Sequence, residues 1–376
     1  MGNPILESIK ELRKERALFV DLKNKNRYKV VAEEEDGSKT AYCFAVPVYD
    51  RSGRLLDLEF HRNATGYRAE GSNSTVCVSD EFLLENSEGT CRIIPREAFR
   101  IRFAGKYVLH GNDCDVSPTT NGLVFKVRCE NGACRFGLTV DRDSWEARGN
   151  NKCFSLMRET NCPGVTVSCI GSADENGWIV APAILESNQE EPGTFVLSII
   201  PQSPYAKFVV FEINLYEQKL FQDTTVESQN ADSNNVYGGT AFLGETTAFG
   251  EQWLYSRPDV SKLADLAGRG ISKAVLHMNQ FNKGADLCAF RVERRFCSFG
   301  STWNNKIGVG SKFTESRMGG IRQSLDLTDL VVNRRTGRLS QPDGFLVKAK
   351  TKGSGFSVVS TGDSFYAPQI LELQYK

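Results

Sequence analysis

From residue 25 onward the chain is built of short runs in which apolar and polar residues alternate, and this period of two constrains its fold more than any other feature. Clusters of Gly, Asn, Asp and Ser separate the runs at intervals of about 8 to 12 residues, the spacing that is typical of β-sandwiches and barrels. Successive side chains of a strand point to opposite faces, so each run can bury one face. We therefore expect an all-β fold with two β-sandwich or jelly-roll-like domains and a short N-terminal helix.

The helix is predicted over residues 3–20, where apolar residues recur at helical spacing: Ile5, Ile9, Leu12 and Leu18. Asn3 can cap it, and Pro4 suits the first helical position because the missing N–H is not needed there. Two roles are open. The helix packs on the first domain, or it is an arm that docks on another subunit.

The turn residues predict two hairpins. Residues 42–49 and 54–60 flank a turn at 50–53, and Pro47 places the first of these strands at a sheet edge or a bulge. Residues 122–129 and 134–140 flank Asn131-Gly132, the strongest short signal for a type I′ turn.

The second hairpin has a predicted register, because the turn fixes which residues face each other. The expected pairs on one face are all apolar: Cys129 with Cys134, Val127 with Phe136, Phe125 with Leu138, and Leu123 with Val140. Cys129 and Cys134 are then either two reduced core thiols or, in an oxidising location, a cross-strand disulfide.

The chain has eleven cysteines, an odd number, and none of their spacings is Cys-x2-Cys. That pattern argues against a zinc ribbon. Residues 1–10 show no secretory signal, so reduced thiols are the expected state. We expect synthesis in the cytoplasm and display on or in a particle or surface layer.

Charge and hydropathy exclude two classes of partner. Lys and Arg number 46 and Asp and Glu also number 46, so the basic excess that a nucleic-acid binder usually shows is absent. The longest apolar runs, such as 195–200, are strand-length and far short of the roughly 20 residues that a spanning helix needs. We expect neither nucleic-acid binding nor membrane insertion.

The sequence offers few candidate catalytic residues, since the chain contains only three histidines. Residues 110–115 (His-Gly-Asn-Asp-Cys-Asp) contain metal-ligand residue types, but one short loop rarely closes a site, and turn chemistry explains them better. A Cys–His nucleophile would pair Cys114 or another cysteine with His61, His110 or His277, and no local signature surrounds any of these. We predict no catalytic residues. Asn63 and Asn73 match the glycosylation pattern, which we attribute to chance.

Six blocks in residues 221–376 occur in a recognisable order: 223–226 followed by 234–239, then 271–278, 301–305 (Ser-Thr-Trp-Asn-Asn), 324–331, 343–348 and 367–375. In these blocks the segment resembles the DNRLRE domain, also called the disaggregatase-related repeat. The resemblance implies a jelly-roll-like module of microbial surface proteins, with carbohydrate-binding members. It implies no particular ligand, because fold and function separate easily. We divide the chain into 1–24, an all-β domain of unknown family at 25–218, and this module at 219–376.

Two sets of site residues follow for the C-terminal module. Trp303 and Tyr237 could stack on a sugar, although each could equally pack within the fold. Asp223 and Asp363 could ligate a structural calcium ion, the one cofactor that the sequence suggests.

Two functions remain open. The first is a non-catalytic structural and adhesion protein in a homo-oligomer or larger particle, such as a phage or tail-like particle or a spore layer, with carbohydrate as a ligand. The alternative is a polysaccharide-active enzyme with a catalytic N-terminal domain and a glycan-binding C-terminal module.

Overall fold

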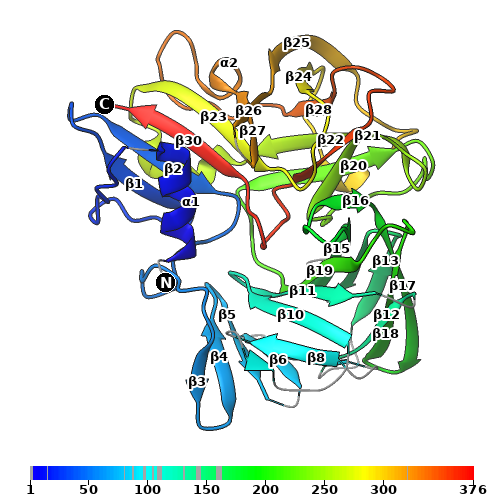
Figure 1. Ribbon diagram of the computed structural model, residues 1–376. Helices are drawn as coiled ribbons and strands as arrows, with labels where there is room; N and C mark the ends of the chain where they lie inside the picture. Colours follow the sequence, from blue (N-terminus) through cyan, green and yellow to red (C-terminus); the bar gives the residue numbers. More distant parts are fainter. Residues whose placement is uncertain are drawn as a thin grey trace. The chain divides into compact units, whose positions relative to one another are not determined.

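A computed structural model describes residues 3–14, 16–79, 81–86, 89–95, 99–103, 106–107, 112–129, 132–140, 145–157, 163–319 and 321–376. The fold is all-β with one short N-terminal helix, which confirms the expected fold class (Figure 1). None of the helices in these ranges combines the length and apolar character that crossing a membrane requires. The chain forms two compact units, the first comprising residues 1–55, 218–236 and 240–376, and the second residues 56–217 and 237–239.

The first unit contains these elements: α1 (Pro4–Arg13), β1 (Lys29–Glu33), β2 (Lys39–Phe44), β20 (Phe221–Glu227), β21 (Thr240–Thr246), β22 (Gly250–Pro258), η1 (Val260–Leu266), β23 (Ile271–Asn279), β24 (Leu287–Val292), η2 (Ser298–Gly300), β25 (Val309–Glu315), β26 (Arg317–Gly319), β27 (Arg322–Asp326), α2 (Thr328–Val331), β28 (Phe345–Ala349), β29 (Phe356–Ser360) and β30 (Ile370–Tyr375).

Two sheets form this unit. The six-stranded sheet has the order β1-β2-β30-β23-β27-β26, and the seven-stranded sheet has the order β25-β24-β28-β22-β21-β29, with β20 also paired to β22. One buried apolar cluster takes side chains from both sheets, for example Leu276 and Leu371 from the first and Leu254 and Val347 from the second. The unit is therefore sandwich-like, with its core between the two sheets.

The second unit contains β3 (His61–Asn63), β4 (Gly66–Glu70), β5 (Ser74–Val78), β6 (Phe82–Asn86), β7 (Gly89–Pro95), β8 (Phe99–Phe103), β9 (Lys106–Tyr107), β10 (Asn112–Pro118), β11 (Gly122–Arg128), β12 (Cys134–Val140), β13 (Glu146–Gly149), β14 (Cys153–Met157), β15 (Pro163–Ala173), β16 (Ile179–Ala181), β17 (Ala183–Glu191), β18 (Thr194–Pro201) and β19 (Phe208–Leu215).

These strands also form two sheets. The nine-stranded sheet has the order β13-β14-β15-β19-β11-β10-β8-β9, with β16 paired to β15, and the eight-stranded sheet has the order β17-β18-β12-β7-β6-β5-β4-β3. The core contains stacked Phe125 and Phe211 from the first sheet, with ring centroids 4.9 Å apart. Phe136 from the second sheet lies 5.4 Å from Phe125. Large aromatic side chains thus fill the space between the layers.

Helix α1 begins as expected but is shorter than expected. The Asn3 side-chain oxygen accepts hydrogen bonds from the N–H groups of Ile5 and Leu6, and Pro4 occupies the first turn. The helix ends at Arg13 because Lys14 takes a positive φ of 56°, so Lys14 and residues 16–20 are not helical.

The helix packs on its own unit. Ile5 and Ile9 are buried, and Arg13 donates hydrogen bonds to Glu34 and to the Tyr42 hydroxyl on β2. Figure 1 shows α1 lying over β1 and β2 of the six-stranded sheet. The apolar stripe that we considered for docking on another subunit is therefore largely covered within one chain.

The division of the chain differs from the expected one at residues 25–55. We placed them in the middle domain, but β1 and β2 extend the six-stranded sheet of the first unit, where β2 pairs with β30 from Lys39 opposite Tyr375 to Phe44 opposite Ile370. Alternation identifies a strand but not its partner, and here the partner lies at the other end of the chain. The boundary at Gln218 lies one residue from the expected one.

The hairpin predicted over 122–140 is wrong in its pairing. Strand β11 pairs with β10 and β19, whereas β12 pairs with β7 and β18 in the opposite sheet. The predicted apolar faces are nevertheless the buried ones, and both contribute to one core cluster. Alternating residues bury the same face whether two strands lie side by side or opposite each other across a core. Residues 130 and 131 lie outside the described ranges.

Of the hairpin predicted over 42–60, the structure contains the turn but not the second strand. Asp50 and Arg54 are joined by a backbone hydrogen bond of 3.0 Å, and Tyr49 bridges Leu55, but no described strand covers residues 54–60. The preceding residues of β2 instead pair on both sides with β1 and β30.

Candidate functional site

Trp303, one of the two predicted sugar-stacking residues, lies beside a second tryptophan. The centroids of the Trp253 and Trp303 rings are 4.9 Å apart, and the rings are inclined by 53°. Trp253 comes from β22, and Trp303 follows η2. Both are partly exposed and pack on a small buried cluster that contains Tyr255 and Phe296. The packing fixes the position of two indoles at the surface.

Two lysines lie over these rings. The Lys306 ammonium is 4.4 Å from the Trp303 centroid, and the Lys348 ammonium is 4.7 Å from the Trp253 centroid and 5.0 Å from that of Phe290. Such cation–π contacts hold the ammonium groups beside the indoles without neutralising their charge. We call the surface formed by Trp253, Phe290, Trp303, Lys306 and Lys348 the aromatic–lysine surface.

A pocket of about 200 Å³ adjoins this surface. Its lining includes Trp253, Glu251, Lys348, Lys350 and Lys352. The Trp253 Nε1 donates to Glu251 at 2.9 Å, which fixes the indole orientation. The pocket thus combines an aromatic ring, the two carboxylates of Glu245 and Glu251, and three ammonium groups. Sequence reasoning identified Trp303 but missed Trp253 and Lys348, because their proximity arises from strands far apart in the chain.

Tyr237, the other predicted sugar-stacking residue, is in the second unit, whereas Trp303 is in the first. Its side chain is only 7% exposed and makes an edge contact with Tyr216, with centroids 5.6 Å apart. Its φ of 72° places it in the left-handed region, as befits a tight loop. A buried ring offers no face to a sugar, so Tyr237 serves packing.

The two carboxylates expected to hold calcium do approach each other, but beside a lysine. The Lys219 ammonium is bonded to the carboxylate of Asp363 and donates to its backbone oxygen at 3.3 Å. Asp223 accepts a hydrogen bond from the Gly362 N–H. All three acid and amine side chains are buried. The Lys219 ammonium thus lies where a calcium ion was expected. The described residues contain no group of three or more metal-ligating side chains.

Burial governs the electrostatics of this cluster. Burial and, to a smaller extent, the neighbouring Asp363 carboxylate raise the pKa of Asp223 to about 7, against the weaker effect of the hydrogen bonds and of Lys219. Burial also raises the pKa of Asp363, with Lys219 opposing it. The cluster therefore has one ion pair and one carboxyl that resists ionisation.

His277 has partners that its local sequence does not reveal. It lies on β23 directly opposite Ser324 on β27, and its Nδ1 is 2.8 Å from the Ser324 hydroxyl. Its Nε2 is 3.0 Å from an oxygen of Glu372 on β30. Burial raises the pKa of Glu372, but the hydrogen bonds from His277 and Gln374 outweigh it, and the pKa is lowered. These are the residue types of a serine–histidine–acid hydrolase.

The surroundings of Ser324 favour a structural role for this array. Ser324 lies in a strand flanked by β23 and β26, whose ladders occupy its backbone groups. A hydrolase needs N–H donors that are free to stabilise an oxyanion, and such donors come from turns or helix ends. The His277 ring instead connects three neighbouring strands by polar contacts. Sequence reasoning missed this array because both contacts are long-range.

The other residues considered for a Cys–His nucleophile have different surroundings. His61 lies 3.3 Å from Asp57, and both side chains are exposed. Cys114 is buried, and burial raises the pKa of its thiol, which suppresses the reactive thiolate. His110 lies outside the described ranges.

The chain matches no protein-family model and no curated protein sequence.

Proposed function

We propose that this chain is a structural and adhesion protein of a surface or particle assembly that binds carbohydrate through the aromatic–lysine surface. The observation that carries the proposal is the pair of partly exposed indoles, Trp253 and Trp303, beside a pocket of about 200 Å³. Partly exposed aromatic rings held by their own packing can stack on the apolar face of a sugar at little entropic cost. The similarity of residues 221–376 to the DNRLRE domain supports the same reading.

The charges favour an acidic saccharide. The Lys348 ammonium lies over the Trp253 ring, and Lys350 and Lys352 line the adjoining pocket. Lys350 is paired with Glu315 at 2.7 Å, and Lys352 lies 3.7 Å from Glu251. A carboxylate or sulfate on a sugar would find Lys348 and Lys306 beside the stacking faces.

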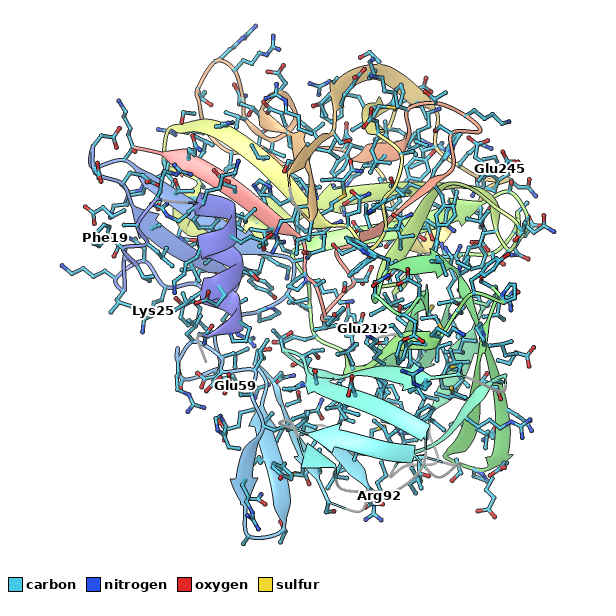
Figure 2. All side chains as sticks on the ribbon, viewed as in Figure 1. Phe19, Lys25, Glu59, Arg92, Glu212 and Glu245 are labelled. Atoms are coloured by element: carbon cyan, nitrogen blue, oxygen red, sulfur yellow. The ribbon has the colours of Figure 1, made fainter. Side chains whose placement is uncertain are left out.

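The assembly part of the proposal is supported by two exposed apolar side chains that follow α1. Phe19, labelled in Figure 2, is 62% exposed, and Leu22 is 67% exposed. Phe19 also lines a cavity of about 790 Å³ with Arg13 and Tyr375. Apolar side chains at a concave surface are suited to contact with another chain.

Affinity electrophoresis in gels that contain neutral or acidic polysaccharides tests the binding function. We expect retardation in acidic gels, reversed by salt, with no change in polysaccharide chain length. A mobility that no polysaccharide changes would contradict the proposal.

The enzyme alternative has one observation in its favour, the contacts of His277 with Ser324 and Glu372. Release of reducing ends from a retarding polysaccharide, abolished by Ser324→Ala, would establish it in place of the non-catalytic function. We expect no release from either protein.

A further inference from the structure

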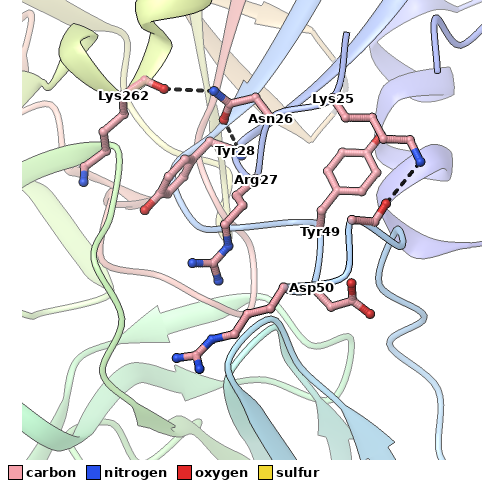
Figure 3. A pocket seen from close by; sticks show the side chains of 9 residues that line it. Lys25, Asn26, Arg27, Tyr28, Tyr49, Asp50 and Lys262 are labelled. Carbon is pink, nitrogen blue, oxygen red and sulfur yellow. Dashed lines mark hydrogen bonds between the residues drawn. The ribbon is translucent and has the colours of Figure 1, made fainter. Parts of the chain in front are cut away.

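A second pocket lies in the first unit, where the residues before β1 meet the turn after β2 (Figure 3). It has a volume of about 430 Å³ and is lined by Lys25, Asn26, Arg27, Tyr28, Tyr49, Asp50, Arg51, Gly53 and Lys262. This volume falls within the range of small-molecule sites, roughly 300 to 1,000 Å³. None of these residues belongs to the aromatic–lysine surface.

The lining carries four cationic side chains and one carboxylate, Asp50. That carboxylate is engaged by its own turn, where it accepts hydrogen bonds from the Ser52 N–H and hydroxyl and from the Arg54 N–H, at 2.9, 2.6 and 2.9 Å. Its pKa is lowered because these bonds outweigh the effect of burial. Asp50 therefore stabilises the turn, and the lining contains more cationic than anionic side chains.

The two lysines in the lining donate hydrogen bonds to neutral oxygens. Lys25 donates to the backbone oxygen of Gly53 at 3.2 Å, and Lys262 donates to the side-chain oxygen of Gln218 at 2.9 Å. Neutral acceptors orient an ammonium group without cancelling its charge. In the view of Figure 3 the Arg27 side chain extends between the rings of Tyr28 and Tyr49, so the lining also contains a guanidinium group.

The framework that presents these groups is held by long-range hydrogen bonds. The Arg27 backbone oxygen accepts from the Val48 N–H at 2.7 Å, and the Tyr28 hydroxyl donates to the Gln218 backbone oxygen at 2.8 Å. The Asn26 side chain donates to the Lys262 backbone oxygen at 3.0 Å. The three segments of the lining are therefore tied to one another, and a ligand would meet preorganised groups.

We propose that this pocket binds a phosphomonoester carried on a small ring. Guanidinium and ammonium groups together match the charge and the hydrogen-bond geometry of a phosphate dianion better than they match those of a single carboxylate. The pocket is larger than one phosphate group, and the rings of Tyr28 and Tyr49 provide flat surfaces for the remainder of the ligand. Sugar phosphates and nucleoside monophosphates share this chemistry.

Isothermal titration of the full chain with glucose 6-phosphate, adenosine monophosphate, glucose and inorganic phosphate tests the proposal. We expect at least one of the two ring phosphates to bind at least tenfold more tightly than glucose and inorganic phosphate, and the tighter of the two identifies the ring. The double variant Lys25→Gln, Lys262→Gln should weaken this binding at least tenfold. The charge-matched control Lys273→Gln, Lys283→Gln, at exposed positions of the same unit, should change it less than twofold.

Three results would overturn the proposal: no binding of either ring phosphate to the folded chain, an affinity for inorganic phosphate equal to that for both, or an equal loss in both double variants. Circular dichroism and melting temperature establish that each variant is folded. Trp303→Ala should leave this binding unchanged, so failure of carbohydrate binding and failure of the phosphate pocket are distinguishable.

Discussion

The Sγ atoms of Cys129 and Cys134 lie 3.0 Å apart although the two residues belong to opposite layers of the second unit. Cys129 follows β11 of the nine-stranded sheet, and Cys134 begins β12 of the eight-stranded sheet. The chain therefore crosses from one layer to the other between them, and the two thiols meet at the edge of the core. Both side chains are buried.

This proximity predicts a disulfide under oxidation. Diamide should remove two hydrogens from the two thiols and join Cys129 to Cys134, because little movement is needed to bring the sulfur atoms to bonding distance. Peptide mapping by mass spectrometry after mild treatment should recover this pair first. The Cys129→Ser variant, treated in the same way, should retain a free Cys134. Recovery of either cysteine mainly in another pairing would contradict the geometry.

Replacement of Gly132 tests the backbone at the same crossing. Gly132 has a φ of +115°, and a Cβ there would meet no atom within 4 Å. Gly132→Ala should destabilise the second unit by about 1 kcal/mol through backbone strain alone. Gly149→Ala is the matched control, since a Cβ there makes only ordinary contacts and the φ is not in the left-handed region. Equal melting temperatures for the two variants would argue against a strained Gly132.

The buried acids in the first unit should respond to substitution in opposite directions. Asp223 has a folded pKa of about 7 against 3.8 as the ordinary value, so its contribution to stability is full below pH 4 and is lost as the pH rises towards 7. Asp223→Asn should therefore raise stability at pH 8 by about 1 kcal/mol or more. It should also flatten the decline in stability between pH 4 and 7.

Asp363→Asn should destabilise the unit by about 3 kcal/mol, because the buried Lys219 ammonium loses its charged partner. Urea unfolding of both variants at pH 5 and pH 8 measures the contrast. A stabilising Asp363→Asn or a destabilising Asp223→Asn at pH 8 would reverse this assignment of the two carboxyls.

Substitutions in and after the N-terminal helix should separate folding from assembly. Ile9 is fully buried, so Ile9→Ala should cost about 2 to 4 kcal/mol of stability. Phe19→Ser with Leu22→Ser should leave stability nearly unchanged and reduce self-association. Sedimentation velocity and thermal melting together distinguish these effects. Self-association that the double variant leaves intact would place the contact elsewhere.

The period-two pattern predicted the strands and their buried faces, but not their partners. Leu123, Phe125 and Val127 are in the core as expected, yet the strand that faces them lies across the core rather than beside them. Likewise β2 pairs with β30, more than 300 residues away along the chain. Local spacing contains no information on such pairings.

The candidate site shows the same limit. Trp303 could be singled out as an aromatic residue among loop residues, but its companions Trp253 and Lys348 come from the separate strands β22 and β28. Tyr237 had the same residue-type signal as Trp303 and proved to be buried. Asp223 and Asp363 were correctly associated, whereas the ammonium group beside them comes from Lys219, in a segment that no ligand pattern marks.

The most direct test of the account is carbohydrate binding by Trp303→Ala compared with Trp178→Ala, a partly exposed tryptophan of the second unit. The dissociation constant of each variant for the acidic polysaccharide that retards the unmodified chain is measured by titration. Loss of one stacking indole should weaken binding at least tenfold, or about 1.4 kcal/mol, while Trp178→Ala stays within twofold of the unmodified chain. Equal affinities for the two variants would contradict the claim that the aromatic–lysine surface binds carbohydrate.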